Sequence, residues 1–140
     1  AARQHLETNF FGPLLMCRAF APVLAAHGGG AILNVLSVAS WINSPLLASY
    51  GASKSAAWAL TNGLRHELRA QGTQVLGLHV GFVDTDLVRD VALPKTAPEL
   101  VAQRSFDALE AGAEEVLADE RARQIKQGLS EHPGVYLRKP

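Results

Sequence analysis

Apolar side chains recur every three or four positions in the first part of the chain, at Leu6, Phe10, Leu14 and Cys17. This spacing places them on one face of an α-helix, so residues 3–27 are predicted to be helical. Pro13 and Pro22 fall inside that helix, and an interior proline costs about 3 kcal/mol. A kink or a break is therefore expected near one of them, and the glycines at 28–30 end the helix.

Two segments have a different pattern: residues 31–37 form a continuous apolar run, and residues 73–80 are predicted to be the next strand. Runs of this length are typical of strands buried on both faces in a parallel sheet. Between them, residues 49–70 are predicted to form a helix that stops at Gly72. The first half of this helix is rich in Ala, Ser and Gly, which allow close approach either of the sheet or of a second subunit.

The rest of the chain begins with a long connection at residues 81–98. Connections of this length in a compact domain are usually functional or mobile. Thr96 and Glu99 match a capping box, so a helix is predicted from there to Leu109 or Glu110. A short strand and a last helix are expected at residues 115–118 and 119–129. This alternation predicts an α/β layer fold with a parallel sheet and no internal domain boundary.

Composition and charge narrow the functions to consider. The 140 residues, 48% hydrophobic and 19% charged, fit one soluble domain with a substantial core. Basic and acidic residues number 13 each, so charge favours neither a nucleic-acid nor a membrane-surface partner. We expect no apolar run of membrane-spanning length and no signal peptide. The single Cys17 excludes an intrachain disulfide and indicates a reducing compartment, taken here as cytoplasmic.

Metal-dependent and serine-hydrolase chemistry have little support in the sequence. The histidines lack the spacing of metal ligands, and each is predicted to lie at the surface or at a helix end. They are His5, His27, His66, His79 and His132. No Gly-x-Ser-x-Gly turn is present, which argues against a hydrolase of that type.

Three polar residues lie before or near the start of the second predicted helix in the sequence. Ser37 follows the first apolar run, Tyr50 comes 13 residues later, and Lys54 four residues after that. Residues four apart share a helix face, and an ammonium near a phenol favours the ionised phenol. A proton-transferring phenol needs such help at neutral pH. Alone, the pair could be an ordinary helix-surface contact, but its place at a strand end and helix start favours a site.

The stretch from Asn34 to Lys54 resembles the active-site segment of the short-chain dehydrogenases/reductases. In that family a strand ending in Asn-hydrophobic-Ser-Ser precedes a Tyr-x-x-x-Lys helix; here Leu36 stands where a first serine is common. The resemblance implies a Rossmann-type fold and an oxidoreductase that interconverts a carbonyl and an alcohol with NAD or NADP. Ser37 would bond the substrate oxygen, unless it only caps the strand end. Tyr50 would be the general acid or base, and Lys54 would also hold the nicotinamide ribose.

Asn9 carries a second part of the resemblance. The segment Asn9-Phe10-Phe11-Gly12 resembles the family's Asn-x-x-Gly helix, whose asparagine holds a water in a proton relay. Without the resemblance, Asn9 is simply a polar residue that interrupts an apolar helix.

The segment Val80–Thr85 resembles the family's Pro-Gly-x-Val-x-Thr motif. Gly81 would then allow close approach to the nicotinamide, while the Val83 backbone and the Thr85 hydroxyl would hold its carboxamide. Val80 replaces the usual proline but still presents a backbone carbonyl. The alternative interpretation is an ordinary turn.

Residues 86–95 would form a lid over the substrate. Several apolar residues are candidates for the pocket wall and suggest an apolar substrate, although any of them could belong to the core. They are Leu46, Leu47, Phe82, Leu87 and Val88.

A dinucleotide site also needs a glycine-rich turn between a strand and a helix. The glycines at 28–30 follow a helix and precede a strand, which is the wrong order. The resemblance therefore covers only the C-terminal half of a family domain. Two hypotheses stay open: an enzyme, homodimeric or homotetrameric by resemblance, whose first half is absent here, or a non-catalytic interaction module. An absent half would leave an open edge strand and an uncovered apolar sheet face.

Overall fold

The computed structural model describes residues 1–82, 89–90, 92 and 94–139. Its strands β1 (Gly30–Val35), β2 (Thr73–His79) and β3 (Glu115–Leu117) form one parallel sheet in the order β1-β2-β3. The helices and helical turns are α1 (Ala2–Leu6), η1 (Glu7–Phe11), α2 (Gly12–Ala26), η2 (Val38–Ser40), α3 (Ala48–Glu67), η3 (Arg69–Gln71), α4 (Pro98–Glu110), α5 (Glu120–Gly128) and η5 (Val135–Leu137). The predicted α/β fold with a parallel sheet and flanking helices is confirmed.

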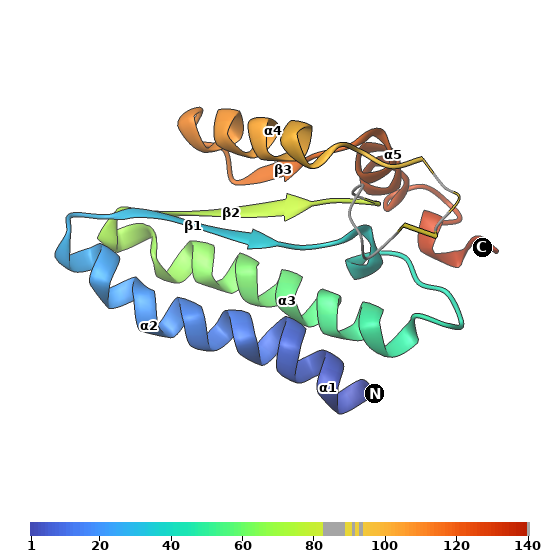
Figure 1. The fold of residues 1–140 in the computed structure, drawn as a ribbon, viewed down its shortest axis with the longest axis horizontal. Helices are drawn as coiled ribbons and strands as arrows, with labels where there is room; N and C mark the ends of the chain where they lie inside the picture. Colours follow the sequence, from blue (N-terminus) through green and yellow to red (C-terminus); the bar gives the residue numbers. More distant parts are fainter. Residues whose placement is uncertain (83–88, 91, 93, 140) are drawn as a thin grey trace.

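Helices cover both faces of the sheet (Figure 1). On the side of α2 and α3, Cys17 and Leu64 pack with Val75 and Ile32. On the side of α4, Leu78 packs with Val101 and its neighbours. Successive strand residues point to opposite faces, so one continuous apolar run supplies both layers. This is why β2 is buried along nearly its whole length.

The turns at the amino ends of β1 and β2 pack backbone against backbone. Gly29 has a φ of +114°, and a Cβ there would lie 2.4 Å from the carbonyl oxygen of Gly72. Gly72 itself has a left-handed φ of +72°. Only glycine fits this approach without moving one of the two turns.

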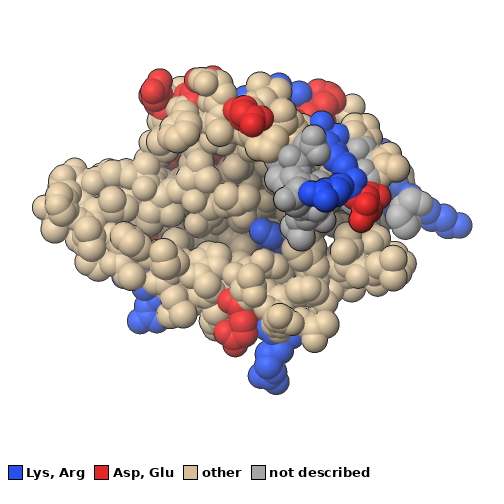
Figure 2. Space-filling view, in the orientation of Figure 1, with Lys and Arg blue, Asp and Glu red and all other residues tan. Residues whose placement is uncertain are grey.

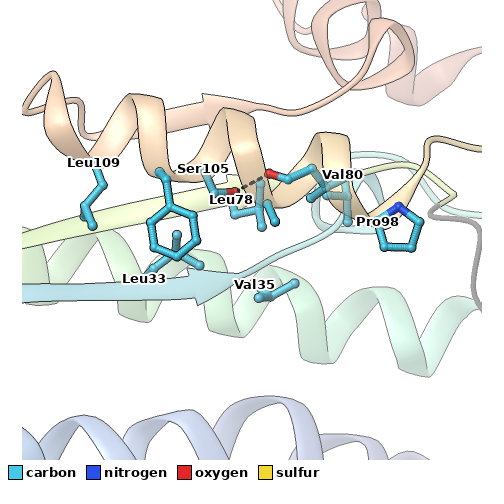
Figure 3. Close-up of a pocket in the computed structure, with 10 residues that line it drawn as sticks. Leu33, Val35, Leu78, Val80, Pro98, Ser105 and Leu109 are labelled. Atoms are coloured by element: carbon cyan, nitrogen blue, oxygen red, sulfur yellow. Dashed lines mark hydrogen bonds between the residues drawn. The ribbon is translucent and has the colours of Figure 1, made fainter.

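β1 is an edge strand within the described part of the chain. Its last residue, Val35, is 57% exposed. Beside it lies an apolar groove of about 510 Å³, in which side chains of β1 and β2 face Pro98, Ser105 and other residues of α4 (Figure 3). An open strand edge and an apolar groove thus lie next to each other in the described part of the chain.

The N-terminal helix runs from Ala2 to Ala26 and accommodates both prolines. Its irregularity is the π-helical turn η1, where the N–H of Gly12 donates to the carbonyl of Glu7. Pro13 follows at once and has no N–H to offer the Asn9 carbonyl four residues earlier, so the wider turn falls where an α-helical bond is missing. Pro22 lies inside α2.

By length and composition this helix could cross a membrane. The expectation that no segment reaches that length was wrong by this measure, since isolated polar residues do not lower the average enough to exclude it. In the structure the helix packs against α3 and β1. Helices that pack within globular proteins can meet the same criterion of length and composition.

The predicted capping box at the start of α4 is wrong. The N-cap is Ala97, without a side-chain bond, and Pro98 occupies the first turn. The N–H of Thr96 donates instead to the carbonyl of Phe82 at 2.9 Å. Proline has no N–H to satisfy and presets the helical φ, so this helix begins without a capping side chain.

His79 lies in the core, contrary to the predicted surface position. Its side chain is 1% exposed, stacks on Trp41 with ring centroids 4.2 Å apart, and places Nε2 3.0 Å from Glu115 Oε1. The residue ends a strand covered on both faces, so strand position overrides the usual exposure of histidine. Lys126 also contacts Glu115.

Acid should therefore weaken the fold through Glu115. The hydrogen bond with His79 is the main cause that lowers the pKa of Glu115 to about 2, against an ordinary 4.5. A pKa lowered by folding adds stability above the unfolded value, and that stability is lost as pH falls from about 4.5 towards 2. We expect Glu115→Gln to reduce the free energy of unfolding at pH 7 by up to about 3 kcal/mol.

Urea titrations at several pH values would measure this difference. It should shrink steadily below pH 4.5. Glu114→Gln, at an exposed neighbouring position, serves as the matched control. A Glu115→Gln protein whose stability has the same pH dependence as the parent would contradict the assignment.

Candidate functional site

Of the described site residues, Ser37, Val80 and Gly81 follow the carboxyl ends of β1 and β2, Tyr50 and Lys54 lie at the start of α3, and Asn9 lies in η1 (Figure 1). Hydrogen bonding between the two segments continues past the strands. The N–H of Leu36 donates to the Leu78 carbonyl at 2.7 Å, and that of Val38 to the Val80 carbonyl at 2.9 Å. Ser37 lies between these two bonds, so its position is fixed relative to β2.

Ser37 caps the short helical turn η2. Its Oγ accepts a hydrogen bond from the N–H of Ala39 at 3.1 Å, and the residue is buried. Ser37 therefore does act as a cap, which was the alternative role considered from the sequence. A hydroxyl that accepts through a lone pair still has its proton to donate, so capping and binding of a substrate oxygen are compatible.

Two serines that the sequence analysis missed hold η2 against α3. Ser40 Oγ donates to the carbonyl of Lys54 at 3.2 Å, and Ser55 Oγ donates to the carbonyl of Ser40 at 2.8 Å. The bonds connect the segment that carries Ser37 to the turn that carries Lys54. No local pattern in the sequence marks Ser40 or Ser55, because their partnership exists only after the chain folds back.

Tyr50 and Lys54 occupy successive turns at the start of α3, as predicted. The ammonium nitrogen of Lys54 lies 6.0 Å from the centre of the Tyr50 ring and donates to the Val35 carbonyl at 3.2 Å. Burial lowers the pKa of Lys54. An ammonium has three N–H donors, so this bond leaves two for other acceptors.

Asn9 reaches the same turn of α3 from the other helix. Its Nδ2 donates to Ser53 Oγ at 3.0 Å, and Ser53 Oγ donates to the Tyr50 carbonyl at 2.6 Å. Ser53 is completely buried. The Ser53 hydroxyl therefore joins the Asn9 side chain to the backbone of Tyr50, although Asn9 and Ser53 are 44 residues apart in sequence.

A pocket of about 330 Å³ opens between β1 and the N-terminal helix. Asn9, Pro13 and Lys54 contribute to its wall, and among the described residues that line it Lys54 is the only basic one. Figure 2 shows this face hollowed, with a basic side chain inside the hollow and few other charges around it. Within the described part of the chain, no group of acidic, histidine or cysteine side chains could hold a metal ion.

The Val80–Gly81 segment is held from the side of α5. Gly81 donates its N–H to Asp119 Oδ2 at 2.7 Å, and Ala122 donates its N–H to Asp119 Oδ1 at 2.8 Å. The buried Asp119 thus caps α5 and fixes the turn after β2 at the same time. The sequence analysis missed Asp119, although an aspartate immediately before a helix is a recognised N-cap signal.

Part of the predicted site falls outside the described residues. The carboxamide contacts expected of Val83 and Thr85 lie there, as do the wall residues Leu87 and Val88. Of the other wall candidates, Leu46 is 95% exposed and Leu47 46% exposed. These two leucines are therefore not core residues, and they flank the loop that leads to Tyr50.

The family model of the short chain dehydrogenases matches residues 1–95, so this chain belongs to the short-chain dehydrogenase family. It is 38% identical over 113 residues to Short-chain dehydrogenase PC-15 of Penicillium crustosum, covering 80% of this chain and 41% of that protein. It is 43% identical over 86 residues to the uncharacterized oxidoreductase YgfF of Escherichia coli, covering 59% of this chain and 35% of that protein. The chain spans less than half the length of these relatives.

Solved structures agree with this placement. A short chain dehydrogenase from Burkholderia cenocepacia in complex with NADP has a TM-score of 0.89 and 42% identity, over 95% of this chain and 56% of that one. A 7α-hydroxysteroid dehydrogenase complexed with NADH and 7-oxo glycochenodeoxycholic acid shares the fold at 23% identity, with a TM-score of 0.75, over 81% of this chain and 52% of that one. The resemblance drawn from the motifs is thereby confirmed at the level of family and fold.

Removing the Asp119 carboxylate should loosen the turn after β2. Asp119→Ala leaves the N–H groups of Gly81 and Ala122 without their acceptors, and a lost cap with an unpaired buried donor costs about 1–3 kcal/mol. We expect that loss in urea unfolding and faster hydrogen exchange at the Gly81 amide.

Asp119→Asn separates the two bonds, because its remaining oxygen can accept from Ala122 while its NH2 group cannot accept from Gly81. It should recover part of the stability but none of the Gly81 protection. Glu120→Ala, one residue away and exposed, is the control. Unchanged exchange at Gly81 in Asp119→Ala would refute this anchoring role.

Proposed function

We propose that this chain supplies the catalytic side of an NAD(P)-dependent oxidoreductase that interconverts a carbonyl and an alcohol. The observation that carries the proposal is that Asn9 and Lys54 line one pocket beside the end of β1, while the Lys54 ammonium lies 6.0 Å from the centre of the Tyr50 ring. The bond between Val38 and Val80 fixes the segment that carries Ser37 at the carboxyl ends of the same strands. Membership of the short-chain dehydrogenase family supports the same chemistry.

The described residues fit the nicotinamide end of such a cofactor. Lys54 faces the pocket with donors to spare, which suits the hydroxyls of a ribose. The relatives crystallised with NADP and NADH support a nicotinamide cofactor of either kind. When bound, the cofactor supplies or accepts the hydride. Val80 and Gly81, with Val83 and Thr85 from the following segment, would border the carboxamide.

Proton transfer is the part that this chain performs. In reduction, the Tyr50 hydroxyl donates its proton to the carbonyl oxygen, and in oxidation its oxygen receives the proton back. Ser37 donates a hydrogen bond to the same substrate oxygen and stabilises its developing negative charge. Lys54 places its positive charge 6.0 Å from the centre of the Tyr50 ring. Asn9 would hold a water that returns protons to this pair, and its carbonyl is suited to that because Pro13 cannot bond it.

The substrate side of the site suggests an apolar molecule. Leu46 and Leu47 present exposed apolar side chains just before Tyr50, and Lys54 is the one charged residue among the described residues of the pocket wall. We infer a small carbonyl compound or alcohol with an apolar body, handled in the cytoplasm. Exposed Leu15, Met16 and Phe20 on α2 support pairing of chains into a homodimer or homotetramer.

Residues 1–140 would form the C-terminal catalytic part of a single NAD(P)-binding domain. The open edge of β1 and the apolar groove under α4 support this, because both are surfaces that a further strand and helix would cover. The short coverage of the relatives supports it as well. A non-catalytic interaction module is the less favoured alternative, since it would have no use for the Asn9–Ser53–Tyr50 arrangement.

The catalytic assignment is tested by Tyr50→Phe in the complete enzyme. We expect turnover to fall by at least about 100-fold, the contribution typical of an acid–base group, while cofactor binding stays within a factor of two. Lys54→Met should weaken both turnover and cofactor affinity, each by roughly tenfold. Nicotinamide absorbance with carbonyl and alcohol panels measures the first, and fluorescence titration the second. Tyr136→Phe is the control, and substantial turnover by Tyr50→Phe would exclude the mechanism.

The domain assignment is tested at Phe106, a groove residue that is 63% exposed on α4. In the isolated 140-residue chain, Phe106→Glu should reduce self-association, because it adds charge to an uncovered apolar surface. In the complete protein it should cost at least about 2 kcal/mol, because the carboxylate would be buried.

Leu100→Glu, on the same helix outside the groove, should have neither effect. Analytical ultracentrifugation and urea unfolding supply the two measurements. Equal behaviour of the two variants in the complete protein would mean that nothing covers the groove.

A further inference from the structure

His5 forms a second connection between α1 and the start of α3. Its Nδ1 lies 2.9 Å from Ser49 Oγ, one residue before Tyr50. Asn9 and Ser53 form the same kind of bond one turn further along, and in both pairs the partners are 44 residues apart. The two helical segments therefore run in the same direction and are joined by two side-chain hydrogen bonds, with Tyr50 between Ser49 and Ser53 in the sequence.

The imidazole of His5 also contacts Tyr50 directly. The two ring centroids are 5.9 Å apart with an interplanar angle of 79°. An edge-to-face contact at this distance is a favoured arrangement of two rings. It restricts the swing of the phenol about its side-chain torsions, and those torsions decide where the hydroxyl points.

We propose that His5 is a positioning residue for Tyr50. It orients the phenol through its ring edge and fixes the first turn of α3 through Ser49, so that the hydroxyl meets the substrate oxygen at a constant angle. Misplacement of a reacting group by about 1 Å can cost roughly 100-fold in rate. The kinetic side of this inference rests on the function proposed for Tyr50, whereas the structural side does not.

The variants separate the two contacts. His5→Asn places an amide near the position of Nδ1, which keeps the bond to Ser49 and removes the ring. His5→Phe keeps the ring edge and removes the bond. Ser49→Ala removes the bond from the other side and disturbs the helix less, so it remains informative if a His5 variant folds poorly. His66→Phe, at an exposed position near the end of α3, is the matched control.

The first measurement does not depend on activity. The chain has two tyrosines, so in a Tyr136→Phe background every tyrosine ring signal belongs to Tyr50. We expect the ring resonances of 13C-labelled Tyr50 to move at least halfway towards free-tyrosine values in His5→Asn, and to stay in place in His66→Phe. Unmoved resonances in His5→Asn would overturn the inference, whatever the kinetics.

The second measurement uses the complete enzyme. We expect kcat to fall about tenfold in His5→Asn and about threefold in His5→Phe and Ser49→Ala, with the cofactor KM unchanged within a factor of two. If the effects of His5→Phe and Ser49→Ala on kcat are not additive in the double variant, that result would support the hydrogen bond between the two residues. An unchanged kcat despite moved resonances would overturn the positioning role, while turnover retained by Tyr50→Phe would sink the proposed function and leave the ring measurement valid.

Discussion

The pairing of two parallel strands beyond their formal ends is the constraint on which the site depends. Parallel strands end at the same edge of a sheet, so the segments after β1 and β2 leave the core side by side. The bond from Val38 to Val80 keeps them paired there, and Asp119 extends the attachment to α5. Without this continuation, Ser37 and Gly81 would belong to two independent loops.

The remaining attachments run through small hydroxyl side chains on α3. Ser49, Ser53 and Ser55 each bond a different neighbour, and each is short enough to let the backbone of that neighbour come close. A larger residue at the buried Ser53 would separate the helices and remove the acceptor of Asn9. The abundance of small residues in this helix thus serves the site as well as packing on the sheet.

Much of the fold was readable because its signals are local. An apolar run predicted β1, helical spacing predicted the N-terminal helix, and Gly72 marked the end of the helical segment before β2. The fold class followed from their order. The predicted capping box at Thr96 failed because the backbone of Thr96 is committed to Phe82, a tertiary contact that no local pattern reveals. His79 was misplaced for a similar reason, since its partner Glu115 lies on another strand.

Only part of the site could be predicted from the sequence, namely the residues that belong to recognisable motifs. Ser37, Tyr50 and Lys54 have a fixed spacing that can be recognised along the chain, and the structure keeps Lys54 beside Tyr50. Asn9 was found through its motif, whereas its contact with Ser53 was not. Ser40 and His5 bond partners far away in sequence, so nothing near them signals these contacts, and at Asp119 the local pattern signals the helix cap but not the bond to Gly81. Motifs name the groups that react, while the groups that hold them become visible in three dimensions.

The glycine contact at the opposite end of the sheet has a consequence for how this sequence can vary. Gly29 meets the backbone of Gly72 directly. Almost any substitution of Gly29 would therefore push the two turns apart, so few variants should be tolerated at this position. The exposed leucines before Tyr50 carry no such restriction. Substitutions at Leu46 and Leu47 should therefore be tolerated much better than substitutions at Gly29.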